Sequence, residues 1–194
     1  MNPDETNARE KIFQATWELI GEGKLEHQIT IREIAARAGV NLALVNYYYQ
    51  SKENLLSQVV ATMMVNLVEQ SNQTDPSETD ALTRLRNMLS VTANAAFLYR
   101  NICRIAISLE LKAGCENSCK LVMPLLQEIV PEASESDLHI IALQLMLPFH
   151  HILLKPEFYN SYLDTDFFDE QKRNQTINRM IESLLAARLG LGRQ

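Results

Sequence analysis

A short segment near the N-terminus, from Ile34 to Val45, limits the possible folds more than any other part of the sequence. Two helices that cross near a right angle over a short turn need a small residue at the crossing, a residue that tolerates positive φ in the turn, and apolar residues on both sides. Ala35, Gly39 and Val45 meet these requirements in order along the chain. This spacing is typical of a helix-turn-helix that binds DNA.

Three helix starts lie close together around this segment. Thr30, with Glu33 three residues later, forms a capping-box pattern before a short helix. Asn41 and Ser51 offer side-chain oxygens that can cap two further helices. Short helices in such close succession favour a helix-turn-helix unit. The alternative is an ordinary helical hairpin in which the alanines and the glycine only permit close packing.

The rest of the sequence predicts further helices. Only six Gly and six Pro occur among 194 residues, and apolar residues recur at helical spacing. We therefore predict an all-α fold, with an N-terminal three-helix helix-turn-helix domain at residues 1–55 and a larger helical bundle for ligand binding and dimerisation at residues 56–194. The polar stretch from Ser71 to Thr79 is the expected linker, and residues 155–165 are an expected connection. A last helix is expected from about Asp166 to Leu189.

The second helix of a helix-turn-helix presents its N-terminal half to the major groove of DNA. The side chains expected to face DNA there are Leu42, Ala43, Leu44, Asn46, Tyr47 and Tyr48, whereas Val45 faces inward. Asn46 can pair with adenine, the aliphatic side chains can touch thymine methyl groups, and the tyrosines can donate hydroxyls to phosphates or base edges. Thr30 and Lys52 can contact phosphates, and Arg32 can reach the DNA backbone or a base.

The residues of this region are similar to those of a known family. The pattern Thr30-x-x-Glu-Ile-Ala-x-x-Ala-Gly-Val-Asn-x-Ala-x-Val-Asn-Tyr-Tyr-Tyr-x-Ser-Lys-Glu-x-Leu-Leu56 resembles the N-terminal domain of TetR-family transcriptional regulators. The resemblance implies an all-helical homodimer that binds a palindromic double-stranded DNA operator, usually as a repressor, and releases it when a small molecule enters the C-terminal domain. Carried over by position, the DNA contacts are Thr30, Arg32, Leu42, Ala43, Leu44, Asn46, Tyr47, Tyr48 and Lys52. Ala43 and Asn46 depart from the Gly or Ser and the Tyr that many members have, which leaves the operator sequence open.

The pattern of the C-terminal half predicts a dimer. The helix expected from Leu138 to Leu154, which Ser136 can cap, carries apolar residues around its whole circumference, so it should be buried on nearly all sides. In a chain of this size, part of that cover is expected from a second copy. The next helix in the sequence, expected after Asp166, carries apolar residues along one face. We therefore expect a homodimer through the last two helices.

Flexible and aromatic side chains in the C-terminal half are the only sign of an effector site. Such residues suit a pocket that adapts to a small, largely apolar molecule, although most residues of this kind simply belong to a core. The candidates are Met88, Phe97, Met123, Met146, Phe149 and His150.

One cysteine pair and one histidine pair are candidates for a metal or redox site. Cys115 and Cys119 lack a second ligand pair nearby, and the adjacent Glu116 would raise a thiol pKa. Adjacent histidines on a helix point about 100° apart, so His150 and His151 cannot readily share one ion. The sequence therefore predicts no metal site and no cofactor.

Charge and hydropathy restrict the partners and the location. The chain has 18 Lys and Arg against 24 Asp and Glu, and residues 1–55 alone carry six basic and eight acidic residues. This balance excludes a protein that coats nucleic acid through bulk charge but permits a local, selective DNA site. The sequence predicts no membrane-spanning segment and no leader in the first 30 residues. Its three cysteines fit a reducing compartment, so a cytoplasmic protein is expected.

Other functional classes are less well supported by the sequence. The motifs of zinc proteases, di-iron bundles, phosphate-binding loops and serine hydrolases do not occur, so the chain is not expected to be an enzyme. The alternative to a DNA-binding regulator is a helical binding module whose helix-turn-helix docks a protein partner instead of DNA.

Overall fold

The computed structural model describes residues 3–71 and 80–186, and all regular structure within those ranges is helical. The all-α prediction is therefore confirmed. The chain divides into two compact units, the first comprising Met1–Met63 with Tyr99–Leu109 and the second comprising Met64–Leu98 with Glu110–Gln194. The division of function between residues 1–55 and 56–194 stays a prediction.

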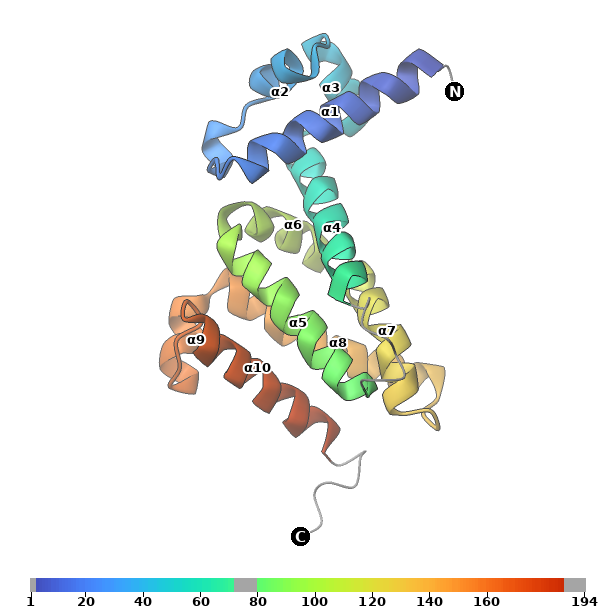
Figure 1. The fold of residues 1–194 in the computed structure, drawn as a ribbon, viewed down its shortest axis with the longest axis vertical. Helices are drawn as coiled ribbons and strands as arrows, with labels where there is room; N and C mark the ends of the chain where they lie inside the picture. The colour runs from blue at the N-terminus through green and yellow to red at the C-terminus, as the bar shows by residue number, and fades with distance from the viewer. Residues whose placement is uncertain (1–2, 72–79, 187–194) are drawn as a thin grey trace. The chain divides into compact units, whose positions relative to one another are not determined.

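The first unit is built on three helices that lie against one another (Figure 1). These are α1 (Pro3–Gly21), α2 (Ile31–Ala38) and α3 (Leu42–Tyr49), with a short 3-10 helix η1 (Glu26–Gln28) before α2. The side chains buried inside it come from all three helices and from the start of α4 (Lys52–Ser71), and they include Ile12, Leu19, Ile34, Val45, Tyr49, Leu55 and Leu56. Part of α6 (Arg100–Lys112) also belongs to this unit.

The predicted caps hold the short helices in place. The Thr30 hydroxyl accepts a hydrogen bond from the Glu33 amide at 3.1 Å, and the Asn41 side chain accepts one from the Ala43 amide at 2.9 Å. Ser51 Oγ accepts from the Asn54 amide at 3.1 Å. Between α2 and α3, Gly39 has φ of 67°, a conformation that favours glycine because a side chain would be strained there. The turn predicted from the sequence is thus present.

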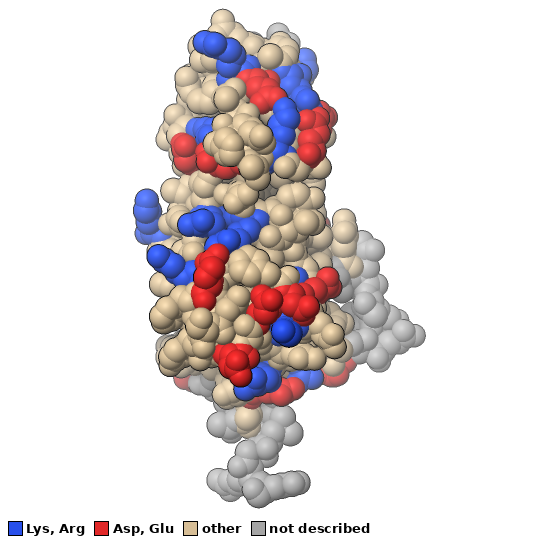
Figure 2. Space-filling view, turned by 90° about the vertical axis from the view of Figure 1, so that its left-hand side faces the viewer, with Lys and Arg blue, Asp and Glu red and all other residues tan. Residues whose placement is uncertain are grey.

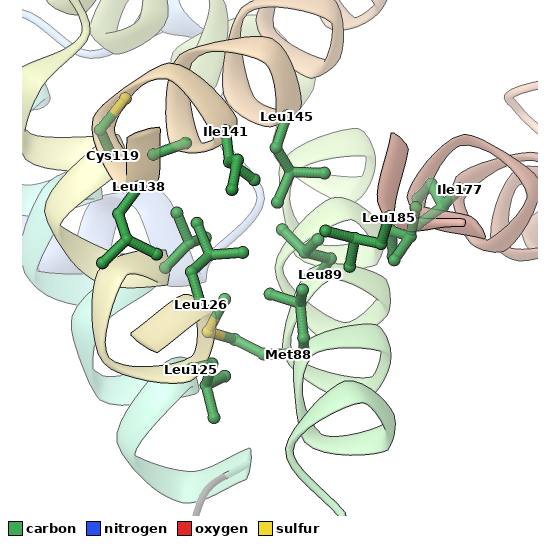
Figure 3. Close-up of a cluster of buried hydrophobic side chains, with 14 of the residues drawn as sticks. Met88, Leu89, Cys119, Leu125, Leu126, Leu138, Ile141, Leu145, Ile177 and Leu185 are labelled. Atoms are coloured by element: carbon green, nitrogen blue, oxygen red, sulfur yellow. The ribbon is translucent and has the colours of Figure 1, made fainter. Parts of the chain in front are cut away.

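The second unit is built around one apolar cluster. It contains α5 (Ala81–Leu98), α7 (Glu116–Ile129), α8 (Glu135–Leu154), α9 (Pro156–Leu163) and α10 (Glu170–Leu185). Figure 3 shows how side chains from α5, α7, α8 and α10 converge. The labelled members of this cluster are Met88, Leu89, Cys119, Leu125, Leu126, Leu138, Ile141, Leu145, Ile177 and Leu185.

Three boundaries differ from the sequence prediction. Ser134, not Ser136, caps α8, because its hydroxyl accepts from the Asp137 amide at 3.2 Å. The expected connection at residues 155–165 contains α9, which begins at Pro156, a residue suited to the first turn of a helix. The last helix, α10, begins at Glu170 with Asp169 as its cap, instead of at about Asp166. Of the linker expected from Ser71 to Thr79, Ser71 is the last residue of α4, and residues 72–79 lie outside the described residues, as does the predicted helix end at Leu189.

One face of α8 is open in the single chain, although this helix was expected to be buried nearly all round. Ile140 is exposed, and Leu143 and Leu147 each keep 38% of their surface. By length and composition, α8 is the one helix among the described residues that could cross a membrane. Buried helices of globular proteins pass the same test, and the opposite face of α8 supplies Leu138 and Ile141 to the core.

Candidate DNA-binding site

The inner face of α3 is fixed by two residues one turn apart. Val45 keeps only 1% of its surface exposed, and Tyr49 is also buried. The Tyr49 hydroxyl donates a hydrogen bond to the Arg9 carbonyl of α1 at 3.0 Å. Burial raises the pKa of Tyr49, so the phenol stays protonated and able to donate. These contacts set the rotation of α3 about its own axis.

The outer face of α3 therefore presents a continuous stripe to solvent. The exposed stripe consists of Leu42, Ala43, Asn46 and Tyr47, with Leu42 40% and Tyr47 72% exposed. Residues spaced four apart lie one above the other on a helix, which is why these four share a side. Leu44 and Tyr48 are half-buried at its edges, and the Tyr48 ring meets Tyr47 edge to face at 5.0 Å.

The two predicted contacts on or before α2 are open to solvent. Thr30 is exposed, and its oxygen accepts the capping hydrogen bond, which leaves the hydroxyl hydrogen able to donate. Arg32, in the first turn of α2, is exposed and makes no ion pair within residues 3–71 and 80–186. Both side chains can meet a phosphate as they stand.

Lys52 is placed differently from these residues. Its ammonium group forms an ion pair with the Glu26 carboxylate and donates to the Glu26 carbonyl at 3.2 Å, and the side chain is only 19% exposed. Lys52 therefore ties η1 to the start of α4. A phosphate contact would require Lys52 to exchange the Glu26 carboxylate for the phosphate.

Other basic residues of the first unit are also paired with carboxylates. Arg37 bonds to Glu22, which raises the Arg37 pKa and lowers the Glu22 pKa, and Lys24 pairs with Glu33. On the face drawn in Figure 2, basic and acidic side chains lie interspersed and no continuous basic surface forms. Sequence reasoning missed these carboxylates because the pairs join separate elements.

The six residues predicted to bind an effector lie within the second unit or on its apolar faces. Met88 is buried in the core, and Met123, Met146 and Phe149 pack against it. Phe97 stacks on Phe167 with ring centroids 6.3 Å apart, and the Arg173 guanidinium lies 4.9 Å from the Phe97 ring centroid.

His150 is a buried core histidine with a defined partner. Its Nδ1 lies 3.2 Å from the Cys115 sulfur, and burial lowers the His150 pKa. Burial raises the pKa of Cys115 to about 12, so its thiol is not reactive near neutral pH. The acidic neighbour that adds to this effect is Glu110, not the expected Glu116, which pairs with Lys120. No group of His, Cys, Asp or Glu within the described ranges could hold a metal ion.

A cavity of about 550 Å³ lies between α8, α9 and α10. Its lining residues are Gln144, Leu145, Leu163, Thr176, Arg179, Met180, Ser183 and Leu184. None of the six predicted effector residues lines it, and their role stays a prediction. Gln144 belongs to the open face of α8, so the cavity opens beside the exposed leucines of that helix.

Comparison with known proteins supports the sequence resemblance. Residues 12–59 match the family model described as bacterial regulatory proteins, tetR family. The nucleoid occlusion factor SlmA of Photorhabdus laumondii is 28% identical over 88 residues, which covers 45% of this chain and 44% of that protein. The alignment thus spans less than half the length of this curated relative.

Solved structures of TetR-family regulators resemble the whole chain in fold. A TetR transcriptional regulator from Rhodococcus sp. RHA1 superimposes with a TM-score of 0.65 at 15% identity, covering 95% of this chain and 98% of that one. The repressor AlkX from a Dietzia strain gives 0.64 at 16% identity, covering 98% and 97%. Bacillus subtilis FadR in complex with stearoyl-CoA gives 0.57 at 15% identity, covering 92% and 98%.

Together the comparisons support a DNA-binding regulator and fit the expectation that the chain is not an enzyme. The N-terminal segment, with its capped helices and exposed α3 stripe, therefore matches the TetR family in sequence, and the whole chain has the fold of TetR-family regulators.

Proposed function

We propose that this protein is a ligand-responsive transcriptional regulator, a repressor that leaves a palindromic operator when a small, largely apolar molecule binds. The observation that carries the proposal is the exposed stripe of α3, held outward by buried Val45 and Tyr49 inside the segment that matches the tetR family model. Residues 1–55 would read DNA, and residues 56–194 would sense the ligand and form the dimer. Such a protein acts in the cytoplasm.

The proposed DNA contacts divide by chemistry. The side chains of the exposed stripe would enter the major groove, and the half-buried Leu44 and Tyr48 would flank them. Thr30 and Arg32 would hold phosphates beside the groove, with the N-terminal amides of α2 adding partial positive charge. Lys52 would join them only after it exchanges Glu26 for a phosphate.

The open face of α8 supports the proposed homodimer. Leu143 and Leu147 lie one turn apart on that face, and the cavity beside them is lined from α10 by Arg179, Met180 and Ser183. A second copy related by two-fold symmetry would cover both the leucines and the cavity, because the same patch faces itself in such a dimer. The dimer would place two copies of α3 so that they enter successive major grooves about 34–36 Å apart.

Ligand release is proposed to act through α4. This helix begins at Lys52 in the first unit and ends at Ser71 in the second, so one continuous helix links the two units. A ligand bound among the helices of the second unit would tilt α4 and change the spacing of the recognition helices. The FadR structure with stearoyl-CoA supports a ligand with a long apolar chain for a protein of this fold.

Selection from a random duplex pool followed by gel-shift titration tests the DNA-binding proposal. We expect the selected palindromic duplex to bind at least about a thousandfold more tightly than random duplex at physiological salt. Equal binding of both duplexes would contradict the proposal. The same titration repeated with long-chain acyl-CoA and with a short-chain control tests whether the long apolar chain of a ligand is needed to release the DNA.

A further inference from the structure

The exposed stripe of α3 has an unusual composition for a surface that reads DNA. No residue from Leu42 to Tyr49 carries a charge. In the major groove, guanine is read mainly by Arg or Lys and cytosine by Asp or Glu, so α3 offers no side chain for either of those pairings. The groups it offers are aliphatic carbons, one amide and one phenol.

The amide of the stripe is available for a base. Asn46 is exposed, and its side chain has no hydrogen-bond partner in the part of the chain that the structure describes. Asn41 differs, because its side-chain oxygen already accepts the Ala43 amide at the start of α3. An asparagine amide matches the N6 and N7 atoms of adenine in a bidentate pair.

The aliphatic part of the stripe lies one turn before Asn46. Leu42 and Ala43 are both exposed, and neither is needed to close the core of the first unit. Thymine is the base that presents a methyl group in the major groove, and Ala or other apolar side chains contact it. The amide and the aliphatic groups of the stripe therefore favour adenine and thymine, whereas the Tyr47 hydroxyl does not select one base.

Charged side chains near α3 do not change this conclusion. Arg37 is bonded to Glu22, and Lys52 to Glu26. Arg32 makes no ion pair within residues 3–71 and 80–186, but it lies on α2, and the first helix of a helix-turn-helix crosses the DNA backbone. Arg32 is therefore placed to meet a phosphate, where it adds affinity without selecting a base.

We infer that each operator half-site is A·T-rich where α3 enters it, with an adenine paired to Asn46 and thymine methyl groups packed against Leu42 and Ala43. This inference rests on the proposed function.

The experiment uses the full chain and the duplex selected from the random pool. Each thymine of the selected half-site is replaced in turn by deoxyuridine, which removes only the methyl group. We expect one or two positions to lose about fourfold in affinity, the loss that one desolvated methyl group corresponds to. In Leu42→Ala the same replacements should have a smaller effect, whereas in Leu98→Ala, changed at an exposed leucine of α5, they should act as in the parent chain.

A second set of variants tests the adenine. Asn46→Ala should lower affinity for the selected duplex by about 5- to 150-fold. At one position of the half-site, this variant should bind duplexes with each of the four base pairs equally well. Asn87→Ala, at an exposed asparagine of α5, should leave affinity unchanged. Circular dichroism melting of each variant shows whether it folds. Arg32→Ala should weaken selected and random duplexes by the same factor.

The possible outcomes separate the inference from the function on which it rests. A selected duplex with G·C at the Asn46-dependent position, with no response to deoxyuridine, would overturn the inference and leave the DNA-binding function intact. A guanine preference that disappears in Arg32→Ala would also overturn it. Failure of every duplex to bind better than random would instead overturn the proposed function itself.

Discussion

Two helices of this protein, α3 and α8, present apolar side chains to solvent. They differ in the other side chains that are exposed on the same face. On α3, Leu42 is followed by the amide of Asn46 and the phenol of Tyr47. On α8, Leu143 and Leu147 are joined by exposed Ile140. An aliphatic surface with a few hydrogen-bonding groups suits base edges, whereas a wider aliphatic surface suits a second protein copy. Exposure alone therefore does not tell the two kinds of site apart.

The largest effect is expected from charging the open face of α8. Leu143→Glu combined with Leu147→Glu should convert the proposed dimer into a monomer, because each symmetric interface would bury four carboxylates. We expect the dimer dissociation constant to rise by about a thousandfold or more. Sedimentation should then give a 22.1 kDa species instead of one of about 44 kDa. Leu98→Glu, at an exposed leucine of α5, is the control and should leave the mass unchanged.

The next largest effect compares the two sides of α3. Val45→Ala removes buried carbon from the core and should lower the free energy of unfolding by about 1–3 kcal/mol. Leu42→Ala removes exposed carbon and should change it by about 0.5 kcal/mol or less. Urea titration followed by circular dichroism measures both. Equal losses for the two variants would show that the assignment of inner and outer faces is wrong.

A pH-dependent change in stability is expected from His150 in the second unit. Burial lowers its pKa below the ordinary value of 6.5, so the unfolded chain binds a proton more readily than the folded chain. Stability should therefore be unaffected by this group well above pH 6.5 and should fall as the pH drops below that value. Thermal unfolding from pH 8 to pH 5 measures the fall. His150→Asn should flatten the curve, whereas His139→Asn, at an exposed histidine of α8, should not.

The smallest effect concerns the ion pair at the start of α4. Glu26→Gln removes the carboxylate that holds Lys52 and should raise affinity for all duplexes by about two- to fivefold at low salt. The slope of log affinity against log salt should steepen by about one unit per subunit, since one more phosphate is neutralised. Glu53→Gln, at an exposed glutamate next to Lys52, serves as the matched control. An unchanged slope in Glu26→Gln would mean that Lys52 stays away from the DNA.

Local features of the fold were predictable from sequence because they depend on near neighbours. A cap bonds to an amide two or three residues away, as at Thr30, Asn41 and Ser51, and a positive φ at Gly39 is a property of one residue. Helical period then placed Val45 inward. Errors arose where two start signals competed, because Ser134 and Ser136 both precede the same apolar helix and only the geometry of the turn selects one.

Contacts between distant residues could not be predicted in the same way. The partners of Lys52 and Arg37 lie 26 and 15 residues before them, and Cys115 lies 35 residues before His150. Each pair forms because two separate segments pack with a particular rotation about their axes and a particular shift along them. Many other carboxylates lie at similar distances in sequence from these basic residues, so spacing alone does not identify the partner.

The sequence by itself determined that the chain is helical, that a helix-turn-helix lies near its N-terminus, and that α3 contains no charged residue, because propensity, capping and period are local properties. Only the tertiary structure decided which basic residues of the first unit pair with carboxylates. It also decided that His150 is buried beside Cys115 and that one apolar face of α8 is exposed. Those outcomes depend on how helices far apart in sequence pack together, since burial and pairing are properties of the assembled surfaces and not of any one segment.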